Sequence, residues 1–227
     1  MNEEGIREIV LPGEFLCEKA GRKLGNGVYL EGEKVFAKVL GIPKIEENEI
    51  SIIPLAGVYI PRTGDRVIGK VVSVEISGWF VDINSPYLAF LPLSEAVVEF
   101  VDIYKTDISR YFDVDDTIFC TVSKVTKDRT VQVSMKNIGS RKLHGGVLIK
   151  INPNKVPRII GKGGSMINII KRKTGCEIYV GRNGYIWIKG EKKTKAVEAI
   201  LKIEKESHVI GLTEKIENML SETYEQK

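Results

Sequence analysis

Alternation of apolar and polar residues predicts strands along most of the first 135 residues of this 227-residue chain. Within residues 1–60 the strand-like pieces are short, and glycines separate them; they lie at 8–11, 28–30, 35–40 and 50–55. A β unit of this size buries little apolar surface. We therefore expect a small N-terminal β domain, residues 1–60, that gains stability from a neighbour.

A second segment, residues 61–137, carries five longer strand patterns. They lie at 65–75, 79–83, 88–91, 117–125 and 130–134, with a short helical stretch near 108–112. Five strands with a helical insert in about 75 residues fit a five-stranded Greek-key barrel of the OB-fold type.

After a polar, glycine-bearing stretch at 136–146, interpreted as a linker, the apolar spacing becomes helical. The expected order over the third domain, residues 146–227, is β-α-α-β-β-α, followed by one extra C-terminal helix at 213–222. The chain is thus predicted to be multidomain, with a β-rich N-terminal half and an α+β C-terminal part.

The net charge of +4 is unevenly distributed. Residues 1–60 hold 7 Lys and Arg against 10 Asp and Glu, whereas residues 145–227 hold 16 against 9. Residues 145–190 contain nine basic residues and one acid, Glu177. A field of one sign suits a polyanionic partner. By charge alone, a solvated lysine-rich surface explains the same counts equally well.

Few residues are available for catalysis or metal binding. Cys17, Cys120 and Cys176 form no CxxC pair, which favours buried free thiols over disulfides or zinc ligands. Two histidines leave little material for His-dependent sites. No apolar stretch approaches the roughly 20 residues that cross a bilayer, and no targeting segment is visible. We expect a cytoplasmic protein without membrane contact, catalytic residues, metal or cofactor.

One motif in the basic segment carries chemistry, the sequence IIGKGGSMI at 159–167. A tight turn between helices needs backbone angles that glycine adopts at low cost. It leaves the N–H groups of the following helix open to a phosphate, and Lys162 adds a positive charge. A nucleotide-binding P-loop is excluded because Gly163, and not Ser or Thr, follows Lys162.

This motif resembles the GXXG loop of KH domains, and the order of elements around it resembles the type I KH fold. KH domains clamp about four nucleotides of single-stranded RNA. The resemblance assigns RNA contact to the loop and its surroundings, namely Arg158, Ile160, Gly161, Lys162, Gly163, Gly164, Ile167 and Lys171. Changing Gly161 or Gly164 to Asp is expected to weaken RNA binding while preserving the fold.

The barrel resembles an S1-type RNA-binding domain in the segments GDRVIG at 64–69, GWFVD at 78–82 and FLPLS at 90–94. The resemblance departs at Leu93, where many such domains have histidine, and at Asp115, where they turn on glycine. Aromatic side chains can stack on bases of any sequence. The weaker candidates for RNA contact on this face are Trp79, Phe80, Tyr87, Phe90, Lys127 and Arg129.

Together with VLPGE at 10–14 and YIPRTGD at 59–65, the three segments resemble archaeal exosome RNA-binding cap subunits. The resemblance implies a non-catalytic subunit that captures single-stranded RNA and guides it into the pore of a hexameric RNase PH-like ring, a 3′–5′ phosphorolytic exoribonuclease. It also implies a trimer of cap subunits, mixing with a zinc-ribbon cap subunit, and a preference for A-rich tails.

Two alternatives remain open from the sequence. A transcription elongation or translation-associated factor can also join S1 and KH domains. A nuclease could use Asp113, Asp115 and Asp116 to bind a metal ion, although carboxylates in a turn are more often solvated.

Overall fold

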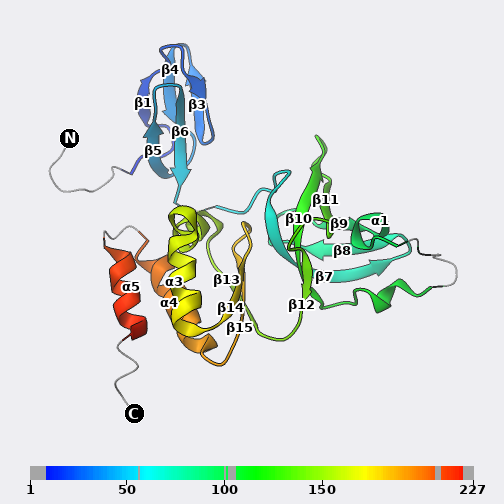
Figure 1. Ribbon diagram of the computed structural model, residues 1–227. Coiled ribbons are helices and arrows are strands. Elements are labelled where there is room, and N and C mark those ends of the chain that lie inside the picture. The colour runs from blue at the N-terminus through cyan, green and yellow to red at the C-terminus, as the bar shows by residue number, and fades with distance from the viewer. Residues whose placement is uncertain (1–8, 56, 100, 102–105, 208–210, 222–227) are drawn as a thin grey trace. The chain divides into compact units, whose positions relative to one another are not determined.

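The computed structural model describes residues 9–55, 57–99, 101, 106–207 and 211–221 (Figure 1). Residue contacts divide the chain into two units between Gly57 and Val58. The first unit contains strands only, and the second joins a barrel to an α+β domain.

The N-terminal unit consists of two three-stranded sheets, β1-β4-β3 and β2-β6-β5. In chain order, β1 to β6 span Phe15–Glu18, Lys23–Leu24, Val28–Glu31, Lys34–Ala37, Gly41–Ile45 and Glu49–Pro54. Their core is small, with Val10, Ala37 and Ile52 at its centre. The predicted small β domain is confirmed. The strand expected at 8–11 is only a bridge from Val10 to Gly41, and residue 8 lies outside the described residues.

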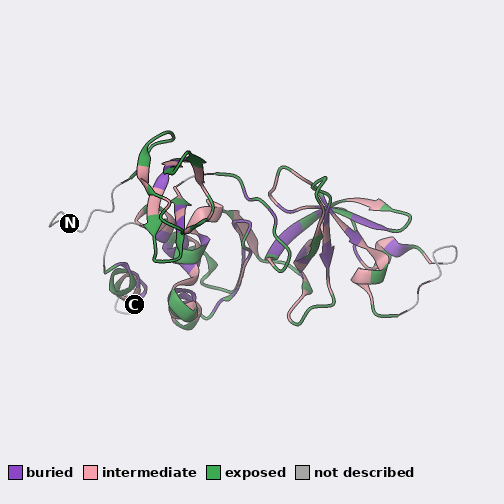
Figure 2. Cartoon of the chain, turned by 90° about the horizontal axis from the view of Figure 1, so that it is seen from above, coloured by how far each residue is buried: buried purple, intermediate pink, exposed green. Residues whose placement is uncertain are grey.

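The predicted five-stranded barrel is also confirmed. Its strands β7 to β11 span Arg66–Glu75, Gly78–Asp82, Ala89–Pro92, Thr117–Val125 and Val131–Ser134. The barrel closes because β10 pairs with both β7 and β11, and β11 also pairs with β9. Buried positions run along these strands (Figure 2). The helical stretch expected at 108–112 is a 3₁₀ turn, Ile108–Arg110, and a short helix α1, Leu93–Ala96, was not predicted.

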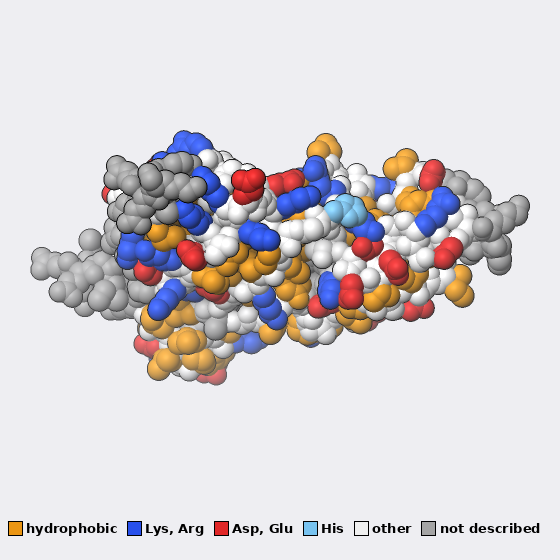
Figure 3. All heavy atoms as spheres, turned by 90° about the horizontal axis from the view of Figure 1, so that it is seen from below, with side chains coloured by type: hydrophobic (Ala, Val, Ile, Leu, Met, Phe, Trp, Pro, Cys, Tyr) orange, Lys and Arg blue, Asp and Glu red, His pale blue; other side chains and the backbone are white. Residues whose placement is uncertain are grey.

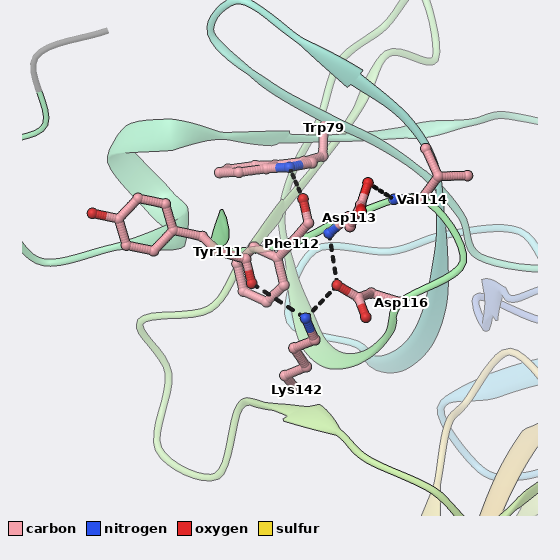
Figure 4. A network of polar contacts seen from close by, with 7 residues as sticks. All are labelled: Trp79, Tyr111, Phe112, Asp113, Val114, Asp116 and Lys142. Atoms are coloured by element: carbon pink, nitrogen blue, oxygen red, sulfur yellow. Dashed lines mark hydrogen bonds and ion pairs between the residues drawn. The ribbon is translucent and has the colours of Figure 1, made fainter. Parts of the chain in front are cut away.

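The segment interpreted as a linker adds a strand to the barrel. Strand β12, Arg141–Leu143, pairs with β10. Lys142 forms an ion pair with Asp116, and the carboxylate of Asp116 accepts a hydrogen bond from the Asp113 N–H at 2.6 Å (Figure 4). The interpretation as a linker is therefore wrong for these three residues, because strand pairing and an ion pair attach them to the barrel.

The same contacts explain the acidic turn at 113–116. Asp115 pairs with Lys70 at 2.8 Å and adopts a positive φ of 74°. Asp tolerates this left-handed conformation better than most residues, so it can occupy a turn that glycine would otherwise serve. Lysines neutralise Asp115 and Asp116, which fits a structural role for these carboxylates better than the nuclease alternative.

The C-terminal domain has the predicted β-α-α-β-β-α order followed by a helix. Its strands β13, β14 and β15 span Val147–Lys150, Glu177–Val180 and Tyr185–Lys189 and form an antiparallel sheet of order β13-β15-β14. A 3₁₀ turn, Pro153–Lys155, leads into the first of helices α2 to α5, which span Val156–Ile160, Ser165–Thr174, Lys193–Lys205 and Leu212–Ser221. One large apolar core joins these helices to the sheet.

The turn between β14 and β15, residues 181–184, joins this domain to the barrel. Asn183 is fully buried. Its side-chain Nδ2 donates to the carbonyls of Ile68 at 2.6 Å and Ile83 at 2.8 Å, and its Oδ1 accepts from the Ile68 N–H at 3.3 Å. The Asn84 side chain in turn donates to the Asn183 carbonyl at 2.6 Å. The Asn183 amide thus satisfies backbone groups of Ile68 on β7 and of Ile83, which directly follows β8.

An apolar cluster that includes Ile68 adds to this contact. It joins the barrel residues Ile68 and Phe119 to Trp187 of β15 and Leu143 of β12. The rings of Phe119 and Tyr179 lie 5.1 Å apart, and those of Tyr179 and Trp187 5.8 Å apart. The sheet therefore packs its helices on one face and the barrel on the other, and the two domains form one unit.

We predict that Asn183→Ala lowers the free energy of unfolding by about 3 kcal/mol, because two carbonyls and one N–H lose their partner inside the domain contact. Urea unfolding of the full chain measures this change. Asn137→Ala, at an exposed position of the same unit, is the control and should change stability by less than about 0.5 kcal/mol. Equal effects of the two variants would contradict the structural role of Asn183.

Candidate nucleic-acid interface

The glycine loop between α2 and α3 requires unusual backbone angles. Gly161, Gly163 and Gly164 have φ values of 75°, 60° and 82°. A Cβ on Gly161 would lie 2.7 Å from the backbone N of Met166, whereas a Cβ on Gly163 would meet no atom within 4 Å. Gly161 is therefore required by both conformation and space, and Gly163 by conformation alone. The open surface at Gly163 allows a ligand to approach the backbone.

Side chains around the loop combine positive charge with an apolar surface. Lys162 and Arg158 are exposed, and Lys171 is half-buried on α3. Ile160 is half-buried, while Ile167 is 7% exposed and belongs mainly to the domain core. Such an arrangement suits a phosphate backbone at the loop and bases over Ile160.

Helix α5 removes part of the expected basic surface. Glu217 on α5 pairs with Arg172 at 3.2 Å and with Lys173 at 3.8 Å, both on α3. Glu217 follows Arg172 by 45 positions, so no local pattern of residues indicates this pairing. Because Arg172 and Lys173 are paired with Glu217, Lys171 remains the α3 cation of the candidate interface. On the face drawn in Figure 3, Lys and Arg side chains gather toward the left, and acidic side chains are interspersed over the barrel at the right.

The barrel places two of its candidate aromatic residues on an outer face. Phe80 and Phe90 lie opposite each other on β8 and β9, with ring centroids 5.3 Å apart. Phe80 is 36% exposed and Phe90 half-buried. Stacking on these rings is chemically feasible for a base of any identity.

Trp79 must be removed from the candidate set. Its side chain is fully buried, its Nε1 donates to the Phe112 carbonyl at 2.6 Å, and its ring packs edge-on against Phe112 (Figure 4). The prediction of a stacking role for Trp79 is wrong because no ring face is accessible. The alternation of Trp79, Val81 and Ile83 with Phe80 and Asp82 already indicated which side chains face the core.

The remaining candidates lie near one end of the barrel. Arg129 donates a hydrogen bond to the Tyr87 hydroxyl, and its guanidinium lies 5.5 Å from the centre of the Tyr87 ring. Lys127 is exposed in the turn before β11. Tyr87 also packs against the barrel core, so its ring is available only in part.

Comparisons with known proteins match every part of this architecture. Family models match residues 7–56 (Exosome RNA binding protein RRP4 N-terminal domain), 58–124 (RRP4, S1 domain) and 146–194 (KH domain). The Exosome complex component Rrp4 of Pyrococcus furiosus is 45% identical over 219 residues, which cover 94% of this chain and 83% of the relative. This chain belongs to the Rrp4 family. Membership of the Rrp4 family argues against the alternative that this chain is a transcription or translation factor.

A second relative and a solved structure are also similar to this chain over most of its length. The Exosome complex component Rrp4 of Methanothermus fervidus is 41% identical over 96% of this chain and 97% of its own. A crystal structure of a protein assigned to the exosome complex as an RNA-binding protein superimposes with a TM-score of 0.68 at 35% identity. The superposition covers 74% of this chain and 98% of that one.

The described part of this Rrp4-family chain holds no candidate for a metal site or a membrane-spanning helix. No group of three or more His, Cys, Asp or Glu residues there could hold a metal ion. No helix there is long and apolar enough to span a membrane. All three cysteines are free; Cys120 and Cys176 are buried as predicted, whereas Cys17 is half-buried. Burial raises the pKa of the Cys120 thiol to about 12, which makes it unreactive at neutral pH.

We predict that Gly161→Ala destabilises the chain by about 2–3 kcal/mol, whereas Gly163→Ala costs about 1 kcal/mol. Both substitutions force a positive φ on alanine, but only the Cβ at Gly161 meets the backbone of Met166. Urea unfolding of both variants tests this order. Gly161→Asp is for the same reason expected to disturb the loop itself, in contrast to the expectation from sequence.

Proposed function

We propose that this chain is a non-catalytic RNA-binding cap subunit of the exosome, which captures single-stranded RNA in the cytoplasm. The observation that carries the proposal is the open, positive-φ glycine loop of the KH domain, with Lys162 at its tip. The residues proposed to contact RNA there are Arg158, Ile160, Lys162, Lys171 and the loop glycines, with Ile167 beneath them.

The barrel supplies a second RNA-binding surface in this proposal, made by Phe80 and Phe90, with Tyr87, Lys127 and Arg129 at its end. The contact made by buried Asn183 supports binding of one RNA strand by both surfaces, because it attaches the KH domain to the barrel as one unit. Once an RNA strand is bound at one surface, its contact with the other surface forms within the same complex. The second contact therefore costs less entropy than a separate binding event would.

The N-terminal unit is proposed to dock on the exosome ring. Its net charge is negative, which suits a protein partner better than RNA. Apolar side chains lie exposed on it, among them Leu11 (61%), Phe15 (50%) and Ile45 (46%). Apolar surface of this kind is typical of protein interfaces.

We further propose the assembly that the family resemblance implies. Three cap subunits, mixed with zinc-ribbon cap subunits, sit on a hexameric RNase PH-like ring. RNA is guided through the pore to the 3′–5′ phosphorolytic sites of the ring, and A-rich tails are preferred. Catalysis then belongs to the ring, and the cap increases RNA binding and degradation efficiency.

We predict that Gly163→Asp weakens binding of single-stranded RNA about tenfold, because it places a like charge beside the phosphates. Fluorescence anisotropy with a labelled oligonucleotide measures the dissociation constant. Gly32→Asp is a matched control, since Gly32 also has a positive φ of 61° and open space around its Cβ, but lies in the N-terminal unit. Equal affinity of Gly163→Asp and the control would exclude the loop as the RNA site.

We also predict that RNA affinity falls steeply with salt and that Lys162→Ala reduces the slope of log K against log[salt] by about 0.7, the value for one phosphate contact to a single strand. Lys34→Ala, at an exposed position of the N-terminal unit, should leave the slope unchanged. A flat salt response of the unmodified chain would point to a protein partner in place of RNA.

A further inference from the structure

A pocket of about 620 Å³ opens beside the aromatic pair of the barrel. It lies between the end of β9, helix α1 and the described residues 97–99 and 101. Its lining includes Ser77, Phe90, Leu93, Ser94, Glu99 and Lys136. This volume is within the range of roughly 300–1,000 Å³ that is usual for small-ligand sites.

The pocket is continuous with the proposed RNA surface through Phe90. This ring forms part of the pocket lining and also makes the tilted pair with exposed Phe80. Leu93 and Val97 add apolar surface, while Ser77 and Ser94 add hydroxyl groups. A flat ring with polar edges would find a stacking partner and hydrogen-bonding groups in the same pocket.

Charged groups of both signs complete the lining. The Tyr111 hydroxyl donates to Oε1 of Glu99 at 2.8 Å and accepts from Arg110 at 3.0 Å. The Tyr111 ring points away from the Asp116–Lys142 pair (Figure 4). The bond orients a carboxylate that can accept further hydrogen bonds. Lys136 lies 3.9 Å from Glu95 and keeps a side-chain exposure of 46%.

We propose that this pocket binds one nucleobase that carries an exocyclic amino group, from the RNA strand held on the barrel; this inference rests on the proposed function. The amino group of cytosine, adenine or guanine donates to Glu99, the base stacks on Phe90, and Lys136 contacts a phosphate. Uracil is disfavoured because carbonyl oxygens flank its N3–H and face the carboxylate. Glu99 is thus a specificity-determining residue, and Tyr111 positions it.

Binding of oligocytidylate and oligouridylate of equal length to the full chain tests this proposal by fluorescence anisotropy. The two pyrimidines stack similarly and differ at C4, where cytosine has an amino group and uracil an oxygen, and at N3, where only uracil carries a hydrogen. The unmodified chain should prefer oligocytidylate by roughly tenfold, the value of one good base contact. In Glu99→Gln the preference should fall to about threefold or less, chiefly because oligouridylate binds more tightly without the negative charge.

Two further variants separate the pocket from general electrostatics. Glu75→Gln removes one exposed carboxylate that belongs to the same barrel but does not itself line the pocket, and should keep the full preference. Tyr111→Phe keeps all charges but releases Glu99, and should reduce the preference without changing the salt dependence of binding.

The outcomes distinguish this inference from the proposed function. Equal binding of both oligonucleotides by the unmodified chain, or an unchanged preference in Glu99→Gln, would overturn the pocket assignment and leave RNA binding intact. Failure of the unmodified chain to bind either oligonucleotide would overturn the proposed function and the pocket with it.

Discussion

The buried amide of Asn183 satisfies backbone groups that would otherwise be left without partners where the barrel meets the KH domain. An unsatisfied buried carbonyl or N–H is costly, so this contact favours one arrangement of the two domains over others. The apolar cluster of Ile68, Phe119, Leu143 and Trp187 adds the surface burial that holds the arrangement together. The turn that makes this contact, residues 181–184, therefore attaches the KH domain to the barrel.

This attachment leaves the opposite side of the KH sheet for the helices and the glycine loop. The loop itself depends on a different constraint, which is the positive φ of Gly161, Gly163 and Gly164. Helix α5 then limits the basic surface, because Glu217 neutralises Arg172 and Lys173. The cationic region around the loop is therefore narrower than the number of Lys and Arg residues in the sequence suggests. Lys162 at the tip of the loop thus becomes more important for the proposed RNA contact.

Side chains alternate along the barrel strands, so that structural side chains point to the core and candidate ligand-binding side chains point outward. On β8, Trp79 faces the core and Phe80 the outer surface, because successive side chains of a strand point to opposite faces. The acidic turn and strand β12 serve the fold, with Lys70 and Lys142 pairing Asp115 and Asp116. Glu99 differs from these carboxylates, since it lines an open pocket beside Phe90.

The sequence by itself determined the three domains, the five barrel strands, the β-α-α-β-β-α order and the glycine loop, because strand and helix periods and glycine turns are properties of neighbouring residues. Only the tertiary structure decided the partners of Asn183, Glu217 and Glu99. Asn183 bonds to a residue 115 positions away, and Glu217 to one 45 positions away. Such contacts depend on how whole domains and helices pack, and no local pattern of residues encodes which distant groups will meet.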